Sequence, residues 1–218
     1  MPGLFITMEG PDGAGKTTVI EKLIPLLEER TNVTITSTRE PGGSRIAEDI
    51  RQIILDVQNV EMDVRTEAIL YAAARRQHLT DRILPNLEKG GIVFCDRFVD
   101  SSLVYQGVAR GIGVEAVYQL NQFATAGKTP DVTLYLDVPA EIGLERIHLA
   151  KGNRQFDRLD QEGLQFHKMV RQGYLDIIPT DSERFIQIDA TKAVDEVVQE
   201  CLTALVDRYP EYFTNGER

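Results

Sequence analysis

Cysteine and histidine are scarce in this chain, which has two cysteines and three histidines among 218 residues. Cys95 and Cys201 are far apart in sequence and fit no metal-binding spacing, and the histidines form no H-x-x-x-H pair, so a zinc site is not expected. Cys95 lies in an apolar segment, which indicates a buried, reduced core residue rather than half of a disulfide.

Long apolar runs and an excess of basic residues are also missing. No stretch approaches the roughly 20 apolar residues that a bilayer span needs, and Met1-Pro2-Gly3 has no basic segment of the kind that opens a signal peptide. We therefore expect a cytoplasmic protein with no membrane partner. The 24 basic residues are outnumbered by 34 acidic ones, and the resulting formal net charge of −10 argues against a nucleic-acid partner. Local clusters of arginine are informative against this acidic background.

Short apolar or β-branched runs alternate with amphipathic segments along the whole chain. Strands are predicted at Leu4–Met8, Val33–Thr38, Ile92–Asp96, Val132–Asp137 and Phe185–Ile188. Helices are predicted at Lys16–Glu29, Ser44–Leu55, Arg65–Glu88, Val114–Thr125, Ala140–Ala150, Gln161–Ile177 and Ala193–Arg208, with a kink at Pro85. The alternation predicts an α/β fold in three layers, with a five-stranded parallel sheet between helices. The length suits one domain, residues 1–218, whose ligands bind beyond the carboxyl ends of the strands.

The first predicted strand runs into a segment that fits G-x-x-x-x-G-K-[ST], from Gly10 to Thr17, and an amphipathic helix follows. In this context the backbone N–H groups of a glycine-rich loop surround a phosphate, and the helix N-terminus adds its dipole. Lys16 is expected to reach the outer phosphates and the Thr17 hydroxyl to ligate Mg²⁺. The sequence therefore predicts a site for a nucleoside triphosphate. The alternative is a glycine-rich turn with a solvated lysine.

Charged residues follow two further predicted strands. Arg39 ends the second strand, where Pro41–Gly43 imposes a turn and Ser44 can cap the next helix. Asp96 and Arg97 end the third strand. An acid at this place commonly orients Mg²⁺ or its water, and Arg97 presents a guanidinium where a transferring phosphoryl group would lie. The alternatives are a solvated arginine at position 39 and a structural ion pair at positions 96 and 97.

Two pairs of residues at i, i+4 spacing are candidates for reading a nucleobase. If the segment after Arg97 is helical, Ser102 and Gln106 share a face and offer a hydroxyl and an amide to a base edge. Tyr71 and Arg75 place an aromatic plane beside a forked donor, which suits base stacking and carbonyl recognition. Tyr71 alone is equally compatible with half-buried packing.

A basic segment follows the fourth predicted strand, with Gly152-Asn153 interrupting its helical pattern. Its basic residues are Arg146, His148, Lys151, Arg154 and Arg158. We interpret residues 146–158 as a loop that closes over ATP and brings arginines to the γ-phosphate. A solvated run of charge is the alternative.

Four motifs in a fixed order give the chain a specific resemblance over nearly its whole length. They are Glu9-Gly10-Pro11-Asp12-Gly13-Ala14-Gly15-Lys16-Thr17, then Arg39-Glu40-Pro41-Gly42-Gly43, then Asp96-Arg97 with Ser101-Ser102 and Tyr105-Gln106-Gly107, and finally Arg158-Leu159-Asp160-Gln161-Glu162. In these motifs the chain resembles the thymidylate kinases. The resemblance implies a P-loop kinase fold with a small basic lid at about residues 146–158, and a homodimer. It also implies transfer of the γ-phosphoryl group of MgATP to dTMP, which gives dTDP and ADP for dTTP biosynthesis.

The resemblance also implies the roles of individual residues. The residues expected to bind ATP are Gly10, Pro11, Asp12, Gly13, Ala14, Gly15, Lys16, Thr17 and Thr18. Those expected to bind dTMP are Asp12, Arg39, Arg51, Tyr71, Arg75, Arg97, Ser102, Tyr105 and Gln106. The catalytic set is Asp12, Lys16, Arg97, Arg146, Arg154 and Arg158, and the Mg²⁺ ligands are Thr17 and Asp96.

Within these sets, the resemblance distinguishes the ends of the acceptor nucleotide. Arg39 and Arg97 would grip its phosphate, with Arg97 bridging toward the ATP γ-phosphate, and Asp12 would contact the sugar 3′-hydroxyl or a metal-bound water. Arg75 would bond a thymine carbonyl. Because Gly13 leaves the phosphate loop without an arginine, the lid must supply the catalytic arginine, as in the bacterial-type subgroup.

The sequence also departs from the family in one place and leaves rival functions open. Tyr71 stands where the family usually has phenylalanine, and its hydroxyl needs a polar partner or water. Another nucleoside monophosphate kinase would share the loop and the fold. A P-loop ATPase or switch would need no second anion pocket, so Arg39 and Arg97 argue against it.

Overall fold

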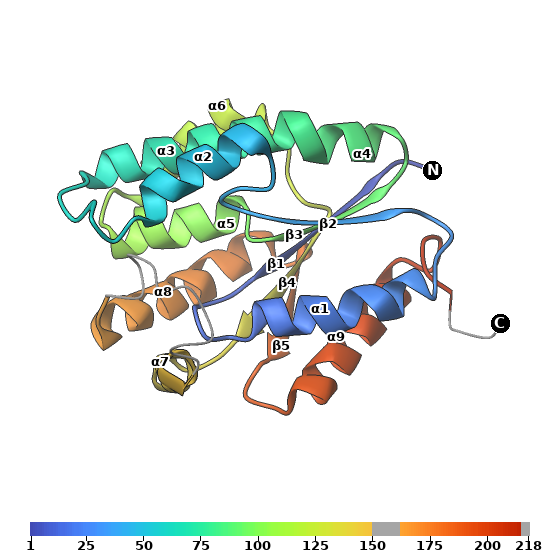
Figure 1. Ribbon diagram of the computed structural model, residues 1–218. Coiled ribbons are helices and arrows are strands. Elements are labelled where there is room, and N and C mark those ends of the chain that lie inside the picture. The colour runs from blue at the N-terminus through green and yellow to red at the C-terminus, as the bar shows by residue number, and fades with distance from the viewer. Residues whose placement is uncertain (150–161, 215–218) are drawn as a thin grey trace.

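The structure is a computed structural model that describes residues 1–149 and 162–214. A parallel sheet of five strands in the order β2-β3-β1-β4-β5 forms its centre (Figure 1). The strands are β1 (Leu4–Glu9), β2 (Ile35–Arg39), β3 (Ile92–Asp96), β4 (Val132–Asp137) and β5 (Phe185–Asp189). The predicted α/β fold with a five-stranded parallel sheet is therefore confirmed.

Helical segments connect the strands and cover both faces of the sheet. The α-helices are α1 (Lys16–Glu28), α2 (Arg45–Leu55), α3 (Val64–His78), α4 (Leu84–Glu88), α5 (Val99–Ser102), α6 (Val114–Thr125), α7 (Ala140–Leu149), α8 (Leu164–Ile177) and α9 (Val194–Arg208). Two π-helical segments, η1 (Leu79–Ile83) and η2 (Leu103–Ala109), and a 3₁₀ turn, η4 (Ile178–Asp181), complete the described elements. In Figure 1, α2, α3, α4 and α6 lie above the sheet, and α1 and α9 lie below it.

The core follows the two-residue period of the strands. Leu4, Ile6 and Met8 of β1 pack in the cluster that contains the apolar faces of α1 and α9. Phe5 faces the opposite side and packs in the cluster that contains η1. A further cluster joins η2 and α8 to β4 through Tyr135. None of the described helices has both the length and the apolar content that crossing a membrane requires.

Some predicted boundaries are wrong by a few residues. The second strand begins at Ile35 rather than Val33, because the Val33 N–H bonds the Thr31 hydroxyl (3.1 Å) in a bend. Helix α8 begins at Leu164, three residues after the predicted start. Ser44 occupies the N-cap position of α2, but its hydroxyl makes no capping bond. The Glu48 carboxylate accepts the Gly43 N–H (2.8 Å) at that helix end instead.

The predicted long helix Arg65–Glu88 is instead three consecutive segments, α3, η1 and α4. The π-helical turn η1 precedes Pro85, which lies in the first turn of α4. Proline has no N–H, and its ring clashes with the carbonyl four residues earlier in a regular α-helix, so a change of helical pitch here is expected. The segment after Arg97 is also helical, but only α5 is α-helical and η2 continues it in π geometry.

Candidate active site at the carboxyl ends of the strands

The sheet register brings the predicted site residues to one edge. Asp96, the last residue of β3, pairs with Met8 of β1 on one side and with Arg39 of β2 on the other. The phosphate loop follows β1 directly. Side chains that are far apart in sequence therefore meet at the carboxyl ends of three adjacent strands, where ligands bind in parallel sheets.

The phosphate loop turns on glycines in backbone conformations that other residues rarely adopt. Gly13 has φ 77°, and a Cβ there would lie 2.1 Å from the carbonyl oxygen of Gly143 in α7. Gly15, at φ 88°, is the N-cap of α1. The loop is thus packed directly on α7 and leads through Gly15 into the N-terminus of α1.

Lys16 is buried at the start of α1 and turns back onto the loop. Its Nζ donates to the carbonyl oxygens of Gly10 and Pro11, each at 3.0 Å. Burial and the nearby Arg97 lower the pKa of Lys16 to about 8. An anion in the loop would offset both causes. The positively charged form of Lys16 would therefore be stabilised by a bound phosphate.

Arg97 occupies the centre of the site in a strained conformation. Its φ of 69° lies in the left-handed region that non-glycine residues avoid. Nη1 donates to the Gly10 carbonyl (3.1 Å) and the Ser101 hydroxyl (3.0 Å), and the guanidinium carbon lies 5.0 Å from the centre of the Tyr105 ring. The backbone turn and these contacts hold the guanidinium against the phosphate loop.

Asp12 is the partner of Arg97 from within the loop. Its Oδ1 accepts from Arg97 Nη2 at 2.6 Å, and its Oδ2 accepts from the Tyr105 hydroxyl at 2.8 Å. Burial opposes its ionisation, but Arg97 and Lys16 outweigh burial and lower the pKa of Asp12 to about 2. The structure therefore brings three of the predicted catalytic residues together, with Asp12 as a permanent carboxylate.

Glu9 is a buried carboxyl group behind Arg97 to which sequence reasoning gave no role. It accepts the Phe98 N–H (2.7 Å), the Ser101 hydroxyl (2.6 Å) and the Tyr174 hydroxyl (2.8 Å). Burial and the nearby Asp100 raise the pKa of Glu9 to about 7. Its position as the last residue of an apolar strand was the available signal, whereas no local pattern marked Tyr174 of α8.

The two predicted Mg²⁺ ligands are compatible with a cation site. Asp96 Oδ1 is buried and has no hydrogen-bond partner within the described residues. Thr17 lies in the first turn of α1, where its hydroxyl is exposed beside the loop. A carboxylate oxygen and a hydroxyl are hard donors of the kind that Mg²⁺ prefers, and the unsatisfied oxygen of Asp96 is a reason for a cation to bind there.

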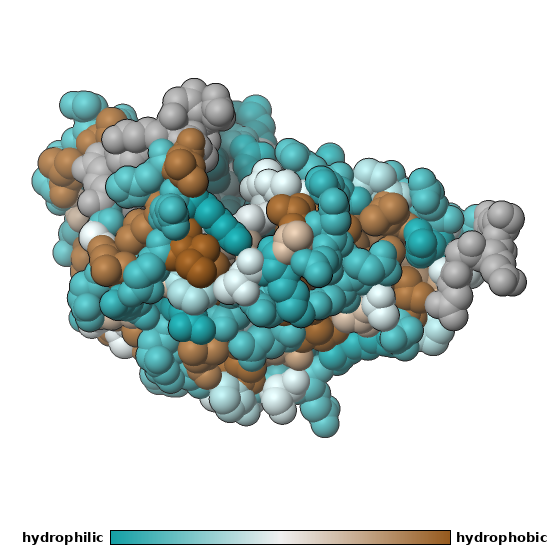
Figure 2. Space-filling model, turned by 90° about the horizontal axis from the view of Figure 1, so that it is seen from below, coloured by the Kyte–Doolittle hydropathy of each residue, from teal (hydrophilic) through white to brown (hydrophobic). Residues whose placement is uncertain are grey.

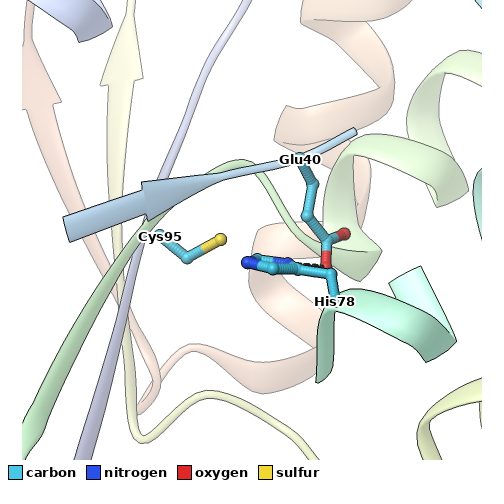
Figure 3. A group of neighbouring side chains, drawn as sticks. All are labelled: Glu40, His78 and Cys95. Carbon is cyan, nitrogen blue, oxygen red and sulfur yellow. Dashed lines mark hydrogen bonds and ion pairs between the residues drawn. The ribbon is translucent and has the colours of Figure 1, made fainter. Parts of the chain in front are cut away.

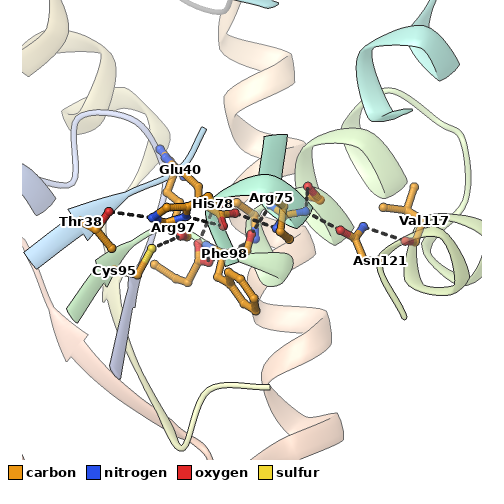
Figure 4. A network of polar contacts seen from close by, with 12 residues as sticks. Thr38, Glu40, Arg75, His78, Cys95, Arg97, Phe98, Val117 and Asn121 are labelled. Atoms are coloured by element: carbon orange, nitrogen blue, oxygen red, sulfur yellow. Dashed lines mark hydrogen bonds and ion pairs between the residues drawn. The ribbon is translucent and has the colours of Figure 1, made fainter. Parts of the chain in front are cut away.

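Arg75 lies at the other end of the site and is almost fully buried, with 2% of its side chain exposed. Figure 4 shows its contacts. Nε donates to Glu40 Oε2 (2.7 Å), Nη1 to the Ser102 hydroxyl (3.0 Å) and to Asn121 Oδ1, and Nη2 to the Phe98 carbonyl (2.9 Å). One N–H of Nη2 has no protein acceptor in the described part of the chain.

The other predicted acceptor-site residues differ in burial and in the partners that they contact. Tyr71 is 9% exposed on α3, one turn before Arg75. The Gln106 amide donates to Glu67 Oε1 (2.8 Å), so its carbonyl end is turned elsewhere. Arg39 is exposed and pairs with Glu48 (3.0 Å), and Arg51 donates to the Pro41 carbonyl (2.8 Å). Glu40 and Asn121 bond Arg75, and Glu67 bonds Gln106; sequence reasoning assigned these three residues no role because each lies on a different element.

One of the three predicted lid arginines is described. Arg146, on α7, reaches back to the phosphate loop, with its Nη1 3.4 Å from the Gly13 carbonyl. Arg154 and Arg158 lie outside the described residues, as does most of the predicted lid. The Mg²⁺, ATP and dTMP roles given above remain predictions at every position.

A phosphate loop beside the half-buried Arg97 and the buried Arg75, at the carboxyl edge of a five-stranded parallel sheet, defines the class of P-loop nucleotide kinases. The thymidylate kinase family model matches residues 8–201. The chain belongs to the thymidylate kinase family.

Known members of the family are similar over nearly the whole chain. The chain is 55% identical over 213 residues to a thymidylate kinase of Lacticaseibacillus casei, covering 98% of this chain and all of that one. With a thymidylate kinase of Enterococcus faecalis the identity is 53% over the same shares. The crystal structure of a thymidylate kinase from Ehrlichia chaffeensis superposes with a TM-score of 0.77, at 31% identity, covering 94% of this chain and 100% of that one.

Proposed function

We propose that this protein transfers the γ-phosphoryl group of ATP to dTMP and releases dTDP and ADP. The observation that carries the proposal is the direct pairing of Arg97 with Asp12, which puts a second anion-binding cation against the phosphate loop. A protein that only bound or hydrolysed a nucleoside triphosphate would not need that cation. Family membership identifies the acceptor.

Phosphoryl transfer to dTMP does not need a strong general base. The acceptor phosphate is already an anionic nucleophile at neutral pH, so the main obstacle is repulsion between two polyanions. Lys16 and the loop N–H groups receive the phosphates of ATP, and Arg39 and Arg97 receive the acceptor phosphate. Because these groups are held in place by the fold, they stabilise the charge of the in-line transition state without further reorganisation.

Arg97 is the bridging residue in this mechanism. Its guanidinium contacts the loop through Gly10 and Asp12 and is held from the far side by Ser101. A nucleotide phosphate that enters the site takes up contacts of this guanidinium that protein atoms now occupy. Arg146 approaches the same loop from α7, and with Arg154 and Arg158 it is proposed to neutralise the γ-phosphate.

Thr17 and Asp96 would hold Mg²⁺, which would supply charge neutralisation to the triphosphate when bound. Arg75 orients the acceptor base through its remaining N–H, with the Ser102 hydroxyl and the Gln106 amide on the same side of the pocket. Asp12 lies within the loop, between the nucleotides, as a contact for the acceptor sugar or a metal-bound water. Tyr71 and Tyr105 supply aromatic surface to the pocket.

We further propose that the protein is a homodimer built on α3 and α6. Large apolar side chains are exposed there: Phe123 at 89%, Ile69 at 56% and Tyr118 at 41%. The face below the sheet differs, since hydrophilic residues cover most of it and apolar ones occur in small separate groups (Figure 2). A single domain over residues 1–218, a lid near 146–158 and a cytoplasmic location remain predictions from the sequence.

The experiment that tests the proposed function is ADP release from MgATP across a panel of nucleoside monophosphates. We expect turnover with dTMP to exceed turnover with dUMP, dCMP and the purine monophosphates. Preference for another monophosphate would keep the kinase mechanism but overturn the acceptor assignment. ADP release that needs no acceptor would overturn the kinase mechanism itself.

A further inference from the structure

One group of three potential metal ligands lies behind the acceptor pocket among the described residues: Glu40, His78 and Cys95 (Figure 3). All three are buried, with His78 and Cys95 fully enclosed. Both ring nitrogens of His78 already have hydrogen-bond partners, and the Cys95 thiol donates to the Arg97 carbonyl (3.1 Å). Burial and the nearby Glu40 raise the pKa of that thiol well above its ordinary value. Hydrogen bonds therefore hold these three side chains in place, and a bound metal ion is not needed to do so.

The hydrogen bonds of His78 indicate that its Nδ1 carries a proton. Nδ1 lies 3.0 Å from Glu40 Oε1, and Nε2 lies 2.7 Å from the Thr38 hydroxyl. Glu40 is ion-paired with Arg75, and a carboxylate only accepts, so Nδ1 must donate. Nε2 contacts the Thr38 hydroxyl, so both ring nitrogens are held while Glu40 also pairs with Arg75.

The second carboxylate oxygen of Glu40 contacts Arg75. Glu40 Oε2 accepts Arg75 Nε at 2.7 Å, and both side chains are 2% exposed. Arg75 and His78 are three residues apart on α3, so one face of the helix presents both groups to the same carboxylate. Fixing Nε fixes the plane of the guanidinium and hence the direction of its remaining N–H.

We propose that His78 is a positioning residue of the acceptor site, which holds Glu40 so that Arg75 is aimed at a carbonyl of the acceptor base. The inference rests on the proposed function, because it concerns the base that Arg75 reads. The chain of contacts runs from Thr38 on β2 through His78 and Glu40 to Arg75. Figure 4 shows these contacts together with the hydrogen bond from Arg75 to Asn121.

The turn after Glu40 closes over this chain. A Cβ at Gly43 would lie 2.4 Å from His78 Nε2 and 2.6 Å from Thr38 Oγ1. The backbone of the turn is therefore in contact with the Thr38–His78 hydrogen bond and leaves little room for water to replace either partner. Because water cannot easily replace a lost partner, we expect a substitution of Thr38 or His78 to change the position of Glu40.

Steady-state kinetics of two His78 variants separate positioning from simple space filling. Asparagine places an amide N–H near the position of Nδ1, whereas leucine fills space without a donor. We expect His78→Leu to raise the KM for dTMP by about tenfold or more while the KM for ATP stays within about twofold, and His78→Asn to recover most of the loss. Equal rises in both KM values, or an unchanged KM for dTMP in His78→Leu, would overturn the proposal.

A milder pair of variants tests the same chain if the leucine variant does not fold. Thr38→Val removes the hydroxyl that holds Nε2 and leaves His78 in place. The matched control is Thr36→Val on the same strand, where the lost hydroxyl bonds Asn86 (3.0 Å), away from Arg75. We expect Thr38→Val to raise the KM for dTMP about threefold and Thr36→Val to leave it unchanged. Equal effects of the two variants would contradict the proposal.

The protonation of His78 can be measured without any turnover. Nitrogen-15 NMR of the full chain labelled at histidine, with the His78 signals assigned by their loss in His78→Asn, should show a proton on Nδ1 of His78. A ring protonated at Nε2 alone would overturn the proposal, because Nδ1 could not then donate to Glu40. This readout stands even if dTMP proves not to be the acceptor, so failure of the proposed function and failure of the positioning chain are distinguishable.

Discussion

At the scale of single residues, Arg97 connects the two halves of the site. It follows β3 in a left-handed conformation and bonds both Asp12 and Gly10 of the phosphate loop. Strain of this kind is retained where the surrounding contacts enforce it, which is common at functional sites. We therefore expect the guanidinium to bind a phosphate that approaches the loop from the proposed acceptor side.

Replacing Arg97 by alanine should lower kcat for phosphoryl transfer by about 100-fold or more, because the transition-state charge loses its bridging cation. The fold should survive, since Arg97 lies in a turn rather than in the sheet. Initial rates at saturating substrates test this, with circular dichroism as the check on folding. A well-folded variant with near-normal kcat would show that Arg97 is not the bridge.

The raised pKa of Glu9 predicts a pH dependence of stability. Its value of about 7 in the folded protein is above the ordinary 4.5, so the folded state binds the proton more tightly than the unfolded state. The resulting stabilisation is fully present below the ordinary value and is lost as the pH rises through about 7. Glu9→Gln, which cannot ionise, should therefore gain Tm relative to the natural protein between about pH 5 and pH 8.

Thermal unfolding of both proteins across that range, without nucleotide, measures the difference. Sites that titrate in both proteins cancel in the comparison. A difference in Tm that stays constant with pH would mean that Glu9 has the same protonation state throughout the range.

Sequence reasoning found the residues of the site that belong to local motifs and missed those that only the fold brings together. Lys16, Thr17 and the loop glycines are fixed by one continuous pattern. His78 and Asn121 lie on different helices, and no local pattern indicates that they meet around Glu40 and Arg75. Burial of Arg75 among these partners is likewise a property of tertiary packing.

At the scale of elements, the phosphate loop and α7 form one packed unit. The backbone of Gly13 lies against that of Gly143, and Arg146 of the same helix approaches the Gly13 carbonyl. The loop is thereby held between α1 and α7.

Gly13→Ala should weaken both stability and ATP binding, because the methyl group meets a backbone carbonyl as well as a positive φ. Gly111→Ala is the matched control: its φ is 72°, and nothing lies within 4 Å of the added carbon. We expect the control to cost about 1 kcal/mol and the Gly13 variant distinctly more. Urea unfolding and ATP titration measure the two effects, and equal costs would contradict the packing role of the loop.

Periodicity predicted every strand and all the long helices, but it did not predict helix geometry. The π-helical segments η1 and η2 keep an apolar period close enough to that of an α-helix to be indistinguishable in sequence. The predicted cap at α2 was also wrong: the Ser44 hydroxyl is buried without a hydrogen-bond partner among the described residues, and Glu48 accepts the Gly43 N–H instead.

At the scale of the whole molecule, the exposed apolar side chains of α3 and α6 predict self-association. Phe123→Glu should shift the protein to monomers, because a charge would then lie in the proposed interface. Val194→Glu, on α9 below the sheet, is the control and should leave the assembly unchanged. Sedimentation velocity distinguishes the species, and a Phe123→Glu protein with unaltered mass would place the interface elsewhere.

In the proposed mechanism the molecule has two anion sites, which share one edge of the parallel sheet. The fold class and the family were predicted from the sequence and are confirmed, since the ordered motifs extend over nearly the full length. The assignment of each side chain to ATP, to the acceptor or to Mg²⁺ stays a prediction.

Phosphorus-31 NMR of the protein with MgATP and dTMP tests the transfer itself most directly. We predict that the γ-phosphate signal of ATP declines as the β-phosphate signals of ADP and dTDP rise together, with no inorganic phosphate. Growth of the inorganic phosphate signal while dTMP remains intact would contradict transfer to the acceptor and would indicate hydrolysis instead.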